Sequence, residues 1–297
     1  MCMMPGLTHF CGGAWDQKKL PSTPPPKRLR KWSVGWWKPY LNSFRRNKGA
    51  CRRLKYIGID GCKDGWFYIW LDDNQSHGFG ILETIDGLTS LVNSAETVLI
   101  DMPIGLKETG PQERQCDKAA RQLLKKRASS IFPAPCRQSL QADDYLSASD
   151  TNFTVTGRRL SKQTYFIMPK IRELDHFMEA EGKQLDIHEF HPELGFLALN
   201  RFAPLKFSKK TGAGQQERQH ILSRYIPSAG TIIALARNRF LRKQAGMDDI
   251  LDAFCGAVTA AFRDHLIFLP AIPDIDPRGL GMQIVYADPD NPCPLSN

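Results

Sequence analysis

From Lys55 onward, short apolar runs alternate with polar turns, a pattern typical of a sheet built from short strands. Polar residues at 73–76 predict the turn between the second and third of these runs. Apolar residues at helical spacing over 85–93 predict a helix, and the run 97–101 predicts a fourth strand. The first three predicted strands are 56–60, 66–72 and 77–82.

The order of these elements is the opening of the ribonuclease H-like fold, in which a three-stranded meander is followed by a helix and a fourth strand. In that fold the first and fourth strands lie side by side and run parallel. Residues 185–190 resume the strand pattern and predict a fifth strand. We therefore expect an α/β domain over 55–297: an RNase H-like mixed five-stranded sheet in the order 3-2-1-4-5, flanked by helices.

Residues 105–184 are long for a connection between two strands, and they contain helical pieces such as 111–126. Structureless loops of this length are uncommon in compact domains. We therefore expect residues 105–184 to form a helical cap insertion over the edge of the sheet.

The remaining segments follow the fifth strand. Pro192 suits the first turn of a helix. The polar and basic residues 208–224 contain glycines, and we expect them to be mobile. Residues 248–265 predict the last strong helix, and the apolar residues 281–286 predict an edge strand or a packed tail.

Charge is distributed unevenly along the chain, whose net charge is +9. Residues 1–54 contain 12 Lys and Arg and one acid, which gives them +11 and leaves −2 for the rest. The main domain is therefore near neutral, and its bulk charge does not indicate a polyanion ligand. We expect residues 1–54 to be a disordered basic extension. The alternative is an arm that binds nucleic acid through its charge and its tryptophans.

The eight cysteines are scattered and form no CxxC pair. In a chain of 297 residues this pattern favours reduced thiols in a cytoplasmic setting over a disulfide framework or a zinc site. No apolar run approaches the ~20 residues of a membrane span. We therefore expect a cytoplasmic globular protein without a membrane segment, and its oligomeric state stays open.

Two aspartates stand at the ends of predicted buried strands, each followed by turn residues. Asp60 precedes Gly61, and Asp101 precedes Pro103 and Gly105. If the two strands are parallel neighbours, both carboxylates lie at the sheet edge where open α/β folds bind ligands. Two bare carboxylates at this distance repel each other, and a divalent cation removes the conflict.

The predicted last helix contributes two more acids, Asp249 and Asp252, which share one face at i,i+3 spacing. Gly256 and Ala260 continue roughly this face, so the helix can lie close against the sheet. Asp249 or its neighbour Asp248 is alternatively a helix cap, but a cap does not explain Asp252. Carboxylates without His or Cys ligands favour Mg²⁺ or Mn²⁺ over zinc. The predicted metal ligands are Asp60, Asp101, Asp249 and Asp252.

Eight motifs in chain order carry a family resemblance: GIDGCKDGW, DMPIGL, RQCDKAAR, SSIFPAPCR, MPKIRELD, HEFHPELGF, SKKTGAG and DDILDA. They resemble the bacterial predicted RNase H-like nuclease family, domain of unknown function family 429. The resemblance covers about residues 55–287 and implies the RNase H-like architecture and a nuclease activity. Residues 1–54 fall outside it.

The resemblance extends to the wider superfamily at single positions. Asp60 resembles the first-strand aspartate of RNase H-like nucleases. Asp101 stands where Holliday-junction resolvases of the RuvC type carry a fourth-strand acid, usually Glu, so the shorter Asp is a departure. Asp249 and Asp252 resemble the D-x-x-D-A pair of the resolvase helix. The resemblance therefore implies that these four residues hold the metal.

Two residues near the fifth strand are further candidates. Glu189 lies on the same face of that strand as Leu185 and Ile187. It is either an additional catalytic ligand or the buried partner of Lys170 or an arginine. His191 either positions water or substrate, or caps a helix.

Basic residues of the expected cap are candidates for binding substrate phosphates, namely Arg121, Arg127 and Lys170. Ordinary ion pairing is the alternative for each of them. The segment 209–212 resembles a phosphate-binding loop only faintly, because it lacks the full G-x-x-x-x-G-K-[ST] spacing.

These patterns together predict a metal-dependent phosphodiester hydrolase, or nuclease, acting on nucleic acid or on a small phosphodiester. Two hard cations about 4 Å apart can activate a water and stabilise the leaving oxygen. A phosphotransferase of the acetate/sugar-kinase type is one alternative, although its phosphate loops are richer in Gly, Ser and Thr than GCKDGW. A non-catalytic, metal-stabilised binding protein is the other. The expected catalytic residues are Asp60, Asp101, Asp249, Asp252 and Glu189.

Overall fold

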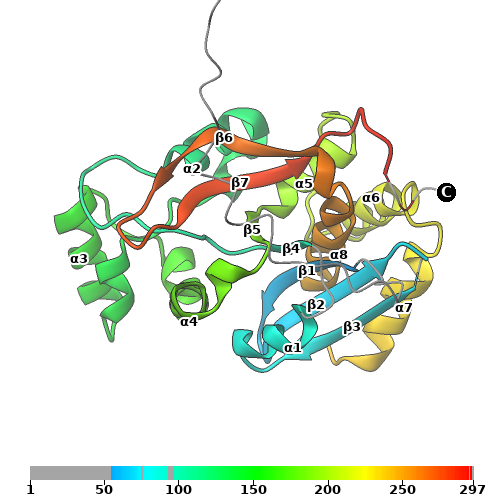
Figure 1. The fold of residues 1–297 in the computed structure, drawn as a ribbon, viewed down its shortest axis with the longest axis horizontal. Coiled ribbons are helices and arrows are strands. Elements are labelled where there is room, and N and C mark those ends of the chain that lie inside the picture. Colours follow the sequence, from blue (N-terminus) through cyan, green and yellow to red (C-terminus); the bar gives the residue numbers. More distant parts are fainter. Residues whose placement is uncertain (1–54, 75, 93–96, 294, 296–297) are drawn as a thin grey trace, which may run out of the picture. The chain divides into compact units, whose positions relative to one another are not determined.

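The computed structural model describes residues 55–74, 76–92, 97–293 and 295, so the expectations for residues 1–54 lie outside the described part. The described residues form a mixed α/β fold around one seven-stranded sheet in the order β3-β2-β1-β4-β5-β7-β6 (Figure 1). Strands β1, β4, β5 and β7 run parallel to one another. Strand β2 is antiparallel to both β1 and β3, and β6 is antiparallel to β7. The strands are β1 (Lys55–Cys62), β2 (Gly65–Asp72), β3 (His77–Leu82), β4 (Thr97–Ile100), β5 (Ile187–Phe190), β6 (Leu266–Ile275) and β7 (Gly281–Ala287).

Eight α-helices accompany the sheet within the described residues: α1 (Leu88–Val92), α2 (Gln115–Leu124), α3 (Tyr145–Thr156), α4 (Lys162–Ala180), α5 (Pro192–Leu199), α6 (Gly212–Ser223), α7 (Ala229–Arg239) and α8 (Met247–Ala261). Short 3₁₀ helices span Ile85–Gly87, Lys125–Ser130, Arg137–Gln141, Gly182–Gln184 and Arg263–His265. None of the helices in the described ranges is long and apolar enough to cross a bilayer.

The sheet has two more strands than expected. Its first five strands have the expected order 3-2-1-4-5, and β7 and β6 extend the sheet beyond β5. Residues 281–286 are therefore neither an edge strand nor a packed tail, because β7 lies between β5 and β6. Strand β6 escaped prediction because Pro270 and Pro273 interrupt its pattern. It lies at the edge of the sheet, where proline is tolerated, and its pairing with β7 is irregular between Leu269 and Asp274.

The segment 208–224, expected to be mobile, instead contains the regular helix α6. The Thr211 hydroxyl accepts a hydrogen bond from the Gly214 N–H at 3.1 Å and caps this helix. A Cβ on Gly214 would lie only 1.9 Å from the carbonyl oxygen of Ser208. Gly214 is therefore required for a close approach of the backbone and does not loosen the chain.

Residues 105–184 contain α2, α3 and α4, as the helical pattern suggested. Helix α4 packs Met168, Ile171 and Leu174 into the core beside Ile57 and Ile59 of β1. This helix thus covers one face of the sheet. The role of 105–184 as a cap over a substrate stays a prediction.

Helix α8 packs on the opposite face, against β1, β2 and β4. A Cβ on Gly58 would lie 1.9 Å from the carbonyl oxygen of Ala253, so β1 and α8 approach to backbone contact there. Gly256 also lies close to β1, since its Cβ would be 3.0 Å from the Cα of Gly58. This contact places the second turn of α8, with Asp252, beside the carboxyl end of β1.

Candidate metal site

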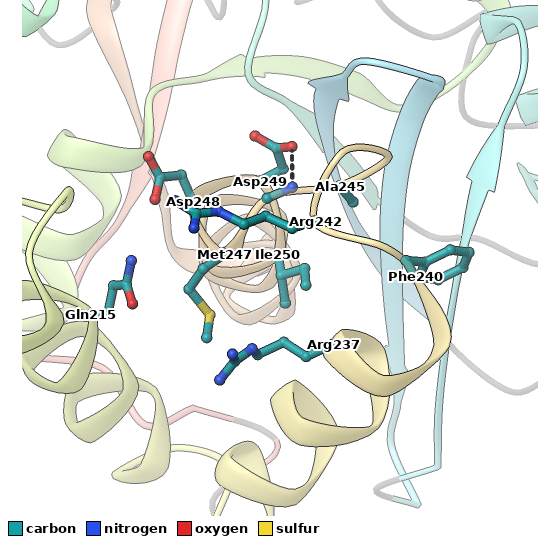
Figure 2. Close-up of a pocket in the computed structure, with 10 residues that line it drawn as sticks. Gln215, Arg237, Phe240, Arg242, Ala245, Met247, Asp248, Asp249 and Ile250 are labelled. Atoms are coloured by element: carbon teal, nitrogen blue, oxygen red, sulfur yellow. Dashed lines mark hydrogen bonds between the residues drawn. The ribbon is translucent and has the colours of Figure 1, made fainter.

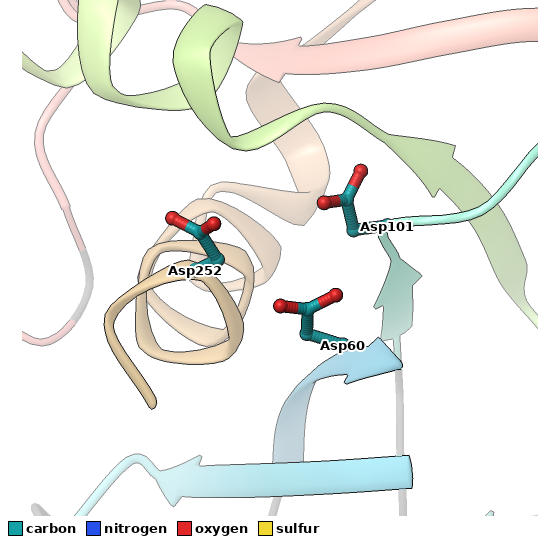
Figure 3. Close-up of side chains that lie close together, drawn as sticks. All are labelled: Asp60, Asp101 and Asp252. Atoms are coloured by element: carbon teal, nitrogen blue, oxygen red, sulfur yellow. The ribbon is translucent and has the colours of Figure 1, made fainter. Parts of the chain in front are cut away.

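Three carboxylates from distant parts of the chain lie together at the carboxyl edge of the sheet (Figure 3). Asp60 belongs to the end of β1, Asp101 directly follows β4, and Asp252 lies in α8. One carboxylate oxygen from each residue lies within 4.8 Å of the other two, a spacing that suits a shared metal ion. The structure thus brings together three of the four predicted metal ligands.

The parallel pairing of β1 and β4 brings Asp60 and Asp101 together. Ile59 pairs with Ile100, and the Asp101 N–H continues the ladder by donating to the Ile59 carbonyl at 3.0 Å. Alternation along β1 points Asp60 to the same side as Gly58, which faces α8. The acids from the two strands therefore meet Asp252 from the helix.

Burial and mutual repulsion disfavour the charged forms of these acids. Asp60 is 9% exposed and Asp252 is 2% exposed. Desolvation raises the pKa of Asp60, and the nearby charges of Asp101 and Asp252 raise it further. Desolvation, followed by repulsion from Asp252, raises the pKa of Asp101 to about 8. Any cation bound among the three acids would relieve both effects.

One cation does contact this group, and the sequence analysis missed it. Lys209 places its Nζ 2.8 Å from Oδ2 of Asp252. The other oxygen of Asp252, Oδ1, is buried and has no hydrogen-bond partner among the described residues. Three carboxylates therefore share one ammonium group, and a buried acceptor is left unsatisfied. The motif SKKTGAG was the only sequence signal for Lys209, and its spacing matched no phosphate loop.

Asp249, the fourth predicted ligand, lies outside the group of three. Its Oδ2 accepts a hydrogen bond from the Gly246 N–H at 2.8 Å and so holds the start of α8. Burial raises the pKa of Asp249 to about 6. The negative charge of Asp249 contributes to the raised pKa of Asp60. Asp249 therefore influences the three acids electrostatically, while its own hydrogen-bond partner is the Gly246 N–H.

Glu189 lies on the other face of the sheet. Its strand neighbour Ile187 packs in the core with α4, and alternation directs Glu189 to the same side. Both of its carboxylate oxygens accept hydrogen bonds from the Arg114 guanidinium, each at 2.7 Å, and Oε2 also accepts from the Ile104 N–H at 2.8 Å. Of the two interpretations of Glu189, the geometry matches the buried partner of an arginine. Its catalytic role stays a prediction.

Two of the basic candidates have structural partners. Arg121 pairs with Glu113 and donates to the Ile131 carbonyl at 3.3 Å. Arg127 contacts Glu193 at 3.3 Å and also donates to two backbone carbonyls of the loop 205–207. These contacts leave fewer donors for a substrate phosphate.

Lys170 lies beside the carboxyl end of β1. Its Nζ is 4.6 Å from the centroid of the Trp66 ring and 3.7 Å from Oε2 of Glu173. A Cβ on Gly61 would lie 3.7 Å from Cγ of Lys170. Lys170 thus packs against Gly61, the residue that follows Asp60.

His191 directly precedes α5 and contacts the Ser130 carbonyl through Nε2 at 3.3 Å. Burial lowers the pKa of His191 to about 4, so the ring is neutral at pH 7. Its Nδ1 is buried and has no hydrogen-bond partner within the described residues. A neutral ring of this kind can orient a polar group but does not supply a positive charge.

A cavity of about 390 Å³ adjoins the start of α8 (Figure 2). Arg237 and Arg242 line it, together with Gln215 of α6 and the acids Asp248 and Asp249. Asp249 thus lines the cavity and also acts electrostatically on Asp60. Both arginines are exposed, and neither has an ion-pair partner among the described residues.

Residues 58–274 match the family described as "Protein of unknown function (DUF429)", and the chain belongs to this family. No curated protein and no solved structure gives a significant match.

Proposed function

We propose that this member of the DUF429 family is a metal-dependent phosphodiester hydrolase, a nuclease, with the RNase H-like fold. One observation carries the proposal: a carboxylate oxygen from each of Asp60, Asp101 and Asp252 lies within 4.8 Å of the other two, and Lys209 is the one described residue that forms a salt bridge with any of them. The strand order 3-2-1-4-5 within the larger sheet supports the fold assignment. The scattered cysteines, which form no CxxC pair in the sequence, favour a cytoplasmic location.

The three acids fit a hard divalent cation. Their oxygen ligands suit Mg²⁺ or Mn²⁺, and the unsatisfied Oδ1 of Asp252 offers a buried acceptor. Asp60, Asp101 and Asp252 would hold the ion, with Asp249 as a further ligand or an outer carboxylate. When bound, the metal would lower the pKa of a water and stabilise negative charge on the phosphoryl oxygens.

The side chains around the three acids would position the substrate. Lys170 lies on the α4 side of the sheet, beside Gly61, and would meet a phosphate that extends past the sheet edge, while Glu173 and Trp66 contact its ammonium group. Arg237 and Arg242, in the cavity next to Asp249, can bind a second phosphate of the same chain. A nucleic-acid strand or a small phosphodiester would meet these groups, and the arginines favour the longer substrate.

The direct test compares two variants, Asp60→Asn and Asp248→Asn. Asp248 is the matched control, because it lines the cavity near α8 but is not one of the three clustered acids. Cleavage would be assayed with single- and double-stranded DNA and RNA oligonucleotides and with bis(p-nitrophenyl) phosphate, with Mg²⁺ or Mn²⁺. We expect Asp60→Asn to abolish metal-dependent cleavage without loss of folding, and Asp248→Asn to retain it. Full activity of a folded Asp60→Asn protein would refute the role.

The two alternatives give different results in the same preparations. A phosphotransferase would be stabilised against heat by ATP and not by DNA or RNA. A metal-stabilised binding protein would lose stability on removal of Mg²⁺ and would cleave none of the substrates.

A further inference from the structure

We propose that Lys209 is a built-in cation that pairs with Asp252 when the site holds no metal and moves to a phosphate oxygen of the substrate when metal binds. The inference rests on the proposed function and assigns a role to a residue outside the predicted metal ligands. It makes Lys209 both a competitor of the metal and a substrate-binding residue.

The contact with Asp252 gives Lys209 its first role. The Nζ lies 2.8 Å from Oδ2, and the lysine side chain is 35% exposed while that of Asp252 is 2% exposed. Within the described ranges, no other cation forms a salt bridge with any of the three acids. The partly exposed ammonium group therefore contacts the same carboxylate that would bind the metal.

The loop that carries Lys209 is held by hydrogen bonds from its backbone N–H groups and to its backbone carbonyls. Glu217 accepts hydrogen bonds from the N–H groups of Lys206 and Phe207 at 2.8 and 3.0 Å. Arg127 donates to the carbonyls of Leu205 and Phe207 at 3.1 and 2.7 Å. These contacts anchor the backbone just before Lys209, so a change of partner requires only rotation of its flexible four-carbon side chain.

Charge balance supplies the reason for the movement. When its three acids are deprotonated, the site carries more negative charge than one ammonium group can balance, and a divalent cation would favour this deprotonated state. A cation bound by Asp252 would repel the ammonium group and compete with it for the carboxylate. The exposed part of Lys209 can then turn outward, where the phosphate of a metal-bound substrate offers anionic oxygens.

A purely structural salt bridge makes the opposite prediction for metal binding. If Lys209 only held Asp252 in place, its removal would disorder a ligand and weaken the metal site. If Lys209 competes with the metal, its removal would strengthen binding. The neighbouring Lys210 is a matched control, because it is exposed and has no ion-pair partner among the described residues.

The experiment measures Mn²⁺ binding by calorimetry in the full chain and in the variants Lys209→Met, Lys209→Arg and Lys210→Met. We expect Lys209→Met to bind Mn²⁺ about tenfold more tightly, a typical size for coupling between two ligands. Lys209→Arg keeps the charge and Lys210→Met keeps Lys209, so neither should tighten binding. Circular dichroism establishes that each variant is folded, and Lys209→Gln replaces Lys209→Met if the latter does not fold.

A second measurement tests the move to the substrate. In Mn²⁺-saturated protein, a phosphorothioate-linked dinucleotide should bind about tenfold more weakly to Lys209→Met than to the original chain, because the variant cannot donate a charge-assisted hydrogen bond to the phosphate. Equal or weaker Mn²⁺ binding by Lys209→Met would overturn the competition, and unchanged dinucleotide binding would overturn the transfer to phosphate. If none of the proteins binds Mn²⁺, the proposed metal site itself fails.

Discussion

Two groups of carboxylates on opposite faces of the sheet differ in how completely protein hydrogen-bond donors serve them. Around Arg114, Glu189 takes two hydrogen bonds of 2.7 Å, and Asp117 takes two more, at 2.5 and 3.2 Å. Backbone N–H groups of Ile104 and Ala134 complete the shell of these two acids. Around Lys209, three acids share one ammonium group.

The comparison separates a structural charge cluster from a ligand site. Residue type and burial are similar in the two groups, so neither property distinguishes them. Burying unpaired charge is costly, and a fold retains it where a ligand completes the site. Both oxygens of each acid beside Arg114 accept hydrogen bonds from protein donors, whereas Asp60, Asp101 and Asp252 have one salt bridge among them within the described residues.

The largest expected effect follows from removing Arg114, the cation that Glu189 and Asp117 contact. Arg114→Met would leave Glu189 and Asp117 buried without their partner, and we expect a loss of about 3–5 kcal/mol in the free energy of unfolding. Urea denaturation measures this change. Arg121→Met is the control, since its partly exposed pair with Glu113 should contribute only about 0–1 kcal/mol. An Arg114→Met protein as stable as the Arg121→Met protein would remove the distinction between the two groups.

An effect of pH on stability is expected from the unsatisfied group. Burial and repulsion raise the pKa of Asp101 to about 8, above the value of about 3.9 for an unfolded aspartate. Between these values the folded protein binds a proton that the unfolded chain lacks, so stability falls as pH rises. We expect the metal-free protein to lose stability from about pH 4 to about pH 8, as measured by urea denaturation at several pH values.

Mn²⁺ should reverse this trend, because the metal binds the deprotonated acids and should flatten or invert the pH slope. Asp60→Asn removes one of the repelling charges and should reduce the slope without metal. The same slope in Asp60→Asn, with or without Mn²⁺, would show that the three acids do not titrate as a group.

The smallest expected effect follows from changing the two arginines that line the cavity beside the three acids. The double variant Arg237→Gln/Arg242→Gln should raise KM for an oligonucleotide with little change in kcat. It should also reduce the salt dependence of binding by about one unit of slope for each phosphate that the variant no longer binds. Lys118→Gln/Lys162→Gln removes two exposed lysines from α2 and α4 and is the control for net charge. Equal reductions in both double variants would assign the effect to overall charge and not to the cavity.

Local patterns were sufficient to predict the three clustered acids. Apolar runs and turn residues placed Asp60 and Asp101 at the ends of strands, and the i,i+3 spacing in α8 indicated Asp252. The likeness of the element order to the RNase H-like fold supplied the parallel pairing of the two strands. The same patterns did not predict β6, because an edge strand tolerates the prolines that break a strand signal.

The partners of the charged residues could not be predicted, because they depend on contacts between distant segments. Arg114 reaches Glu189 across 75 positions of the chain. Lys209 reaches Asp252 across 43 positions, and the path of its loop depends on Arg127 and Glu217. Sequence periodicity describes single helices and strands. It therefore identified the acidic residues but not the basic residues that pair with them.

The most direct measurement is a crystal of the protein soaked in Mn²⁺, with anomalous diffraction recorded at the manganese edge. We predict an anomalous peak between Asp60, Asp101 and Asp252, with metal–oxygen distances of about 2.1 Å, and the Lys209 ammonium displaced from Asp252. A map without a peak among these carboxylates, with Lys209 still paired to Asp252 at saturating Mn²⁺, would contradict the metal site.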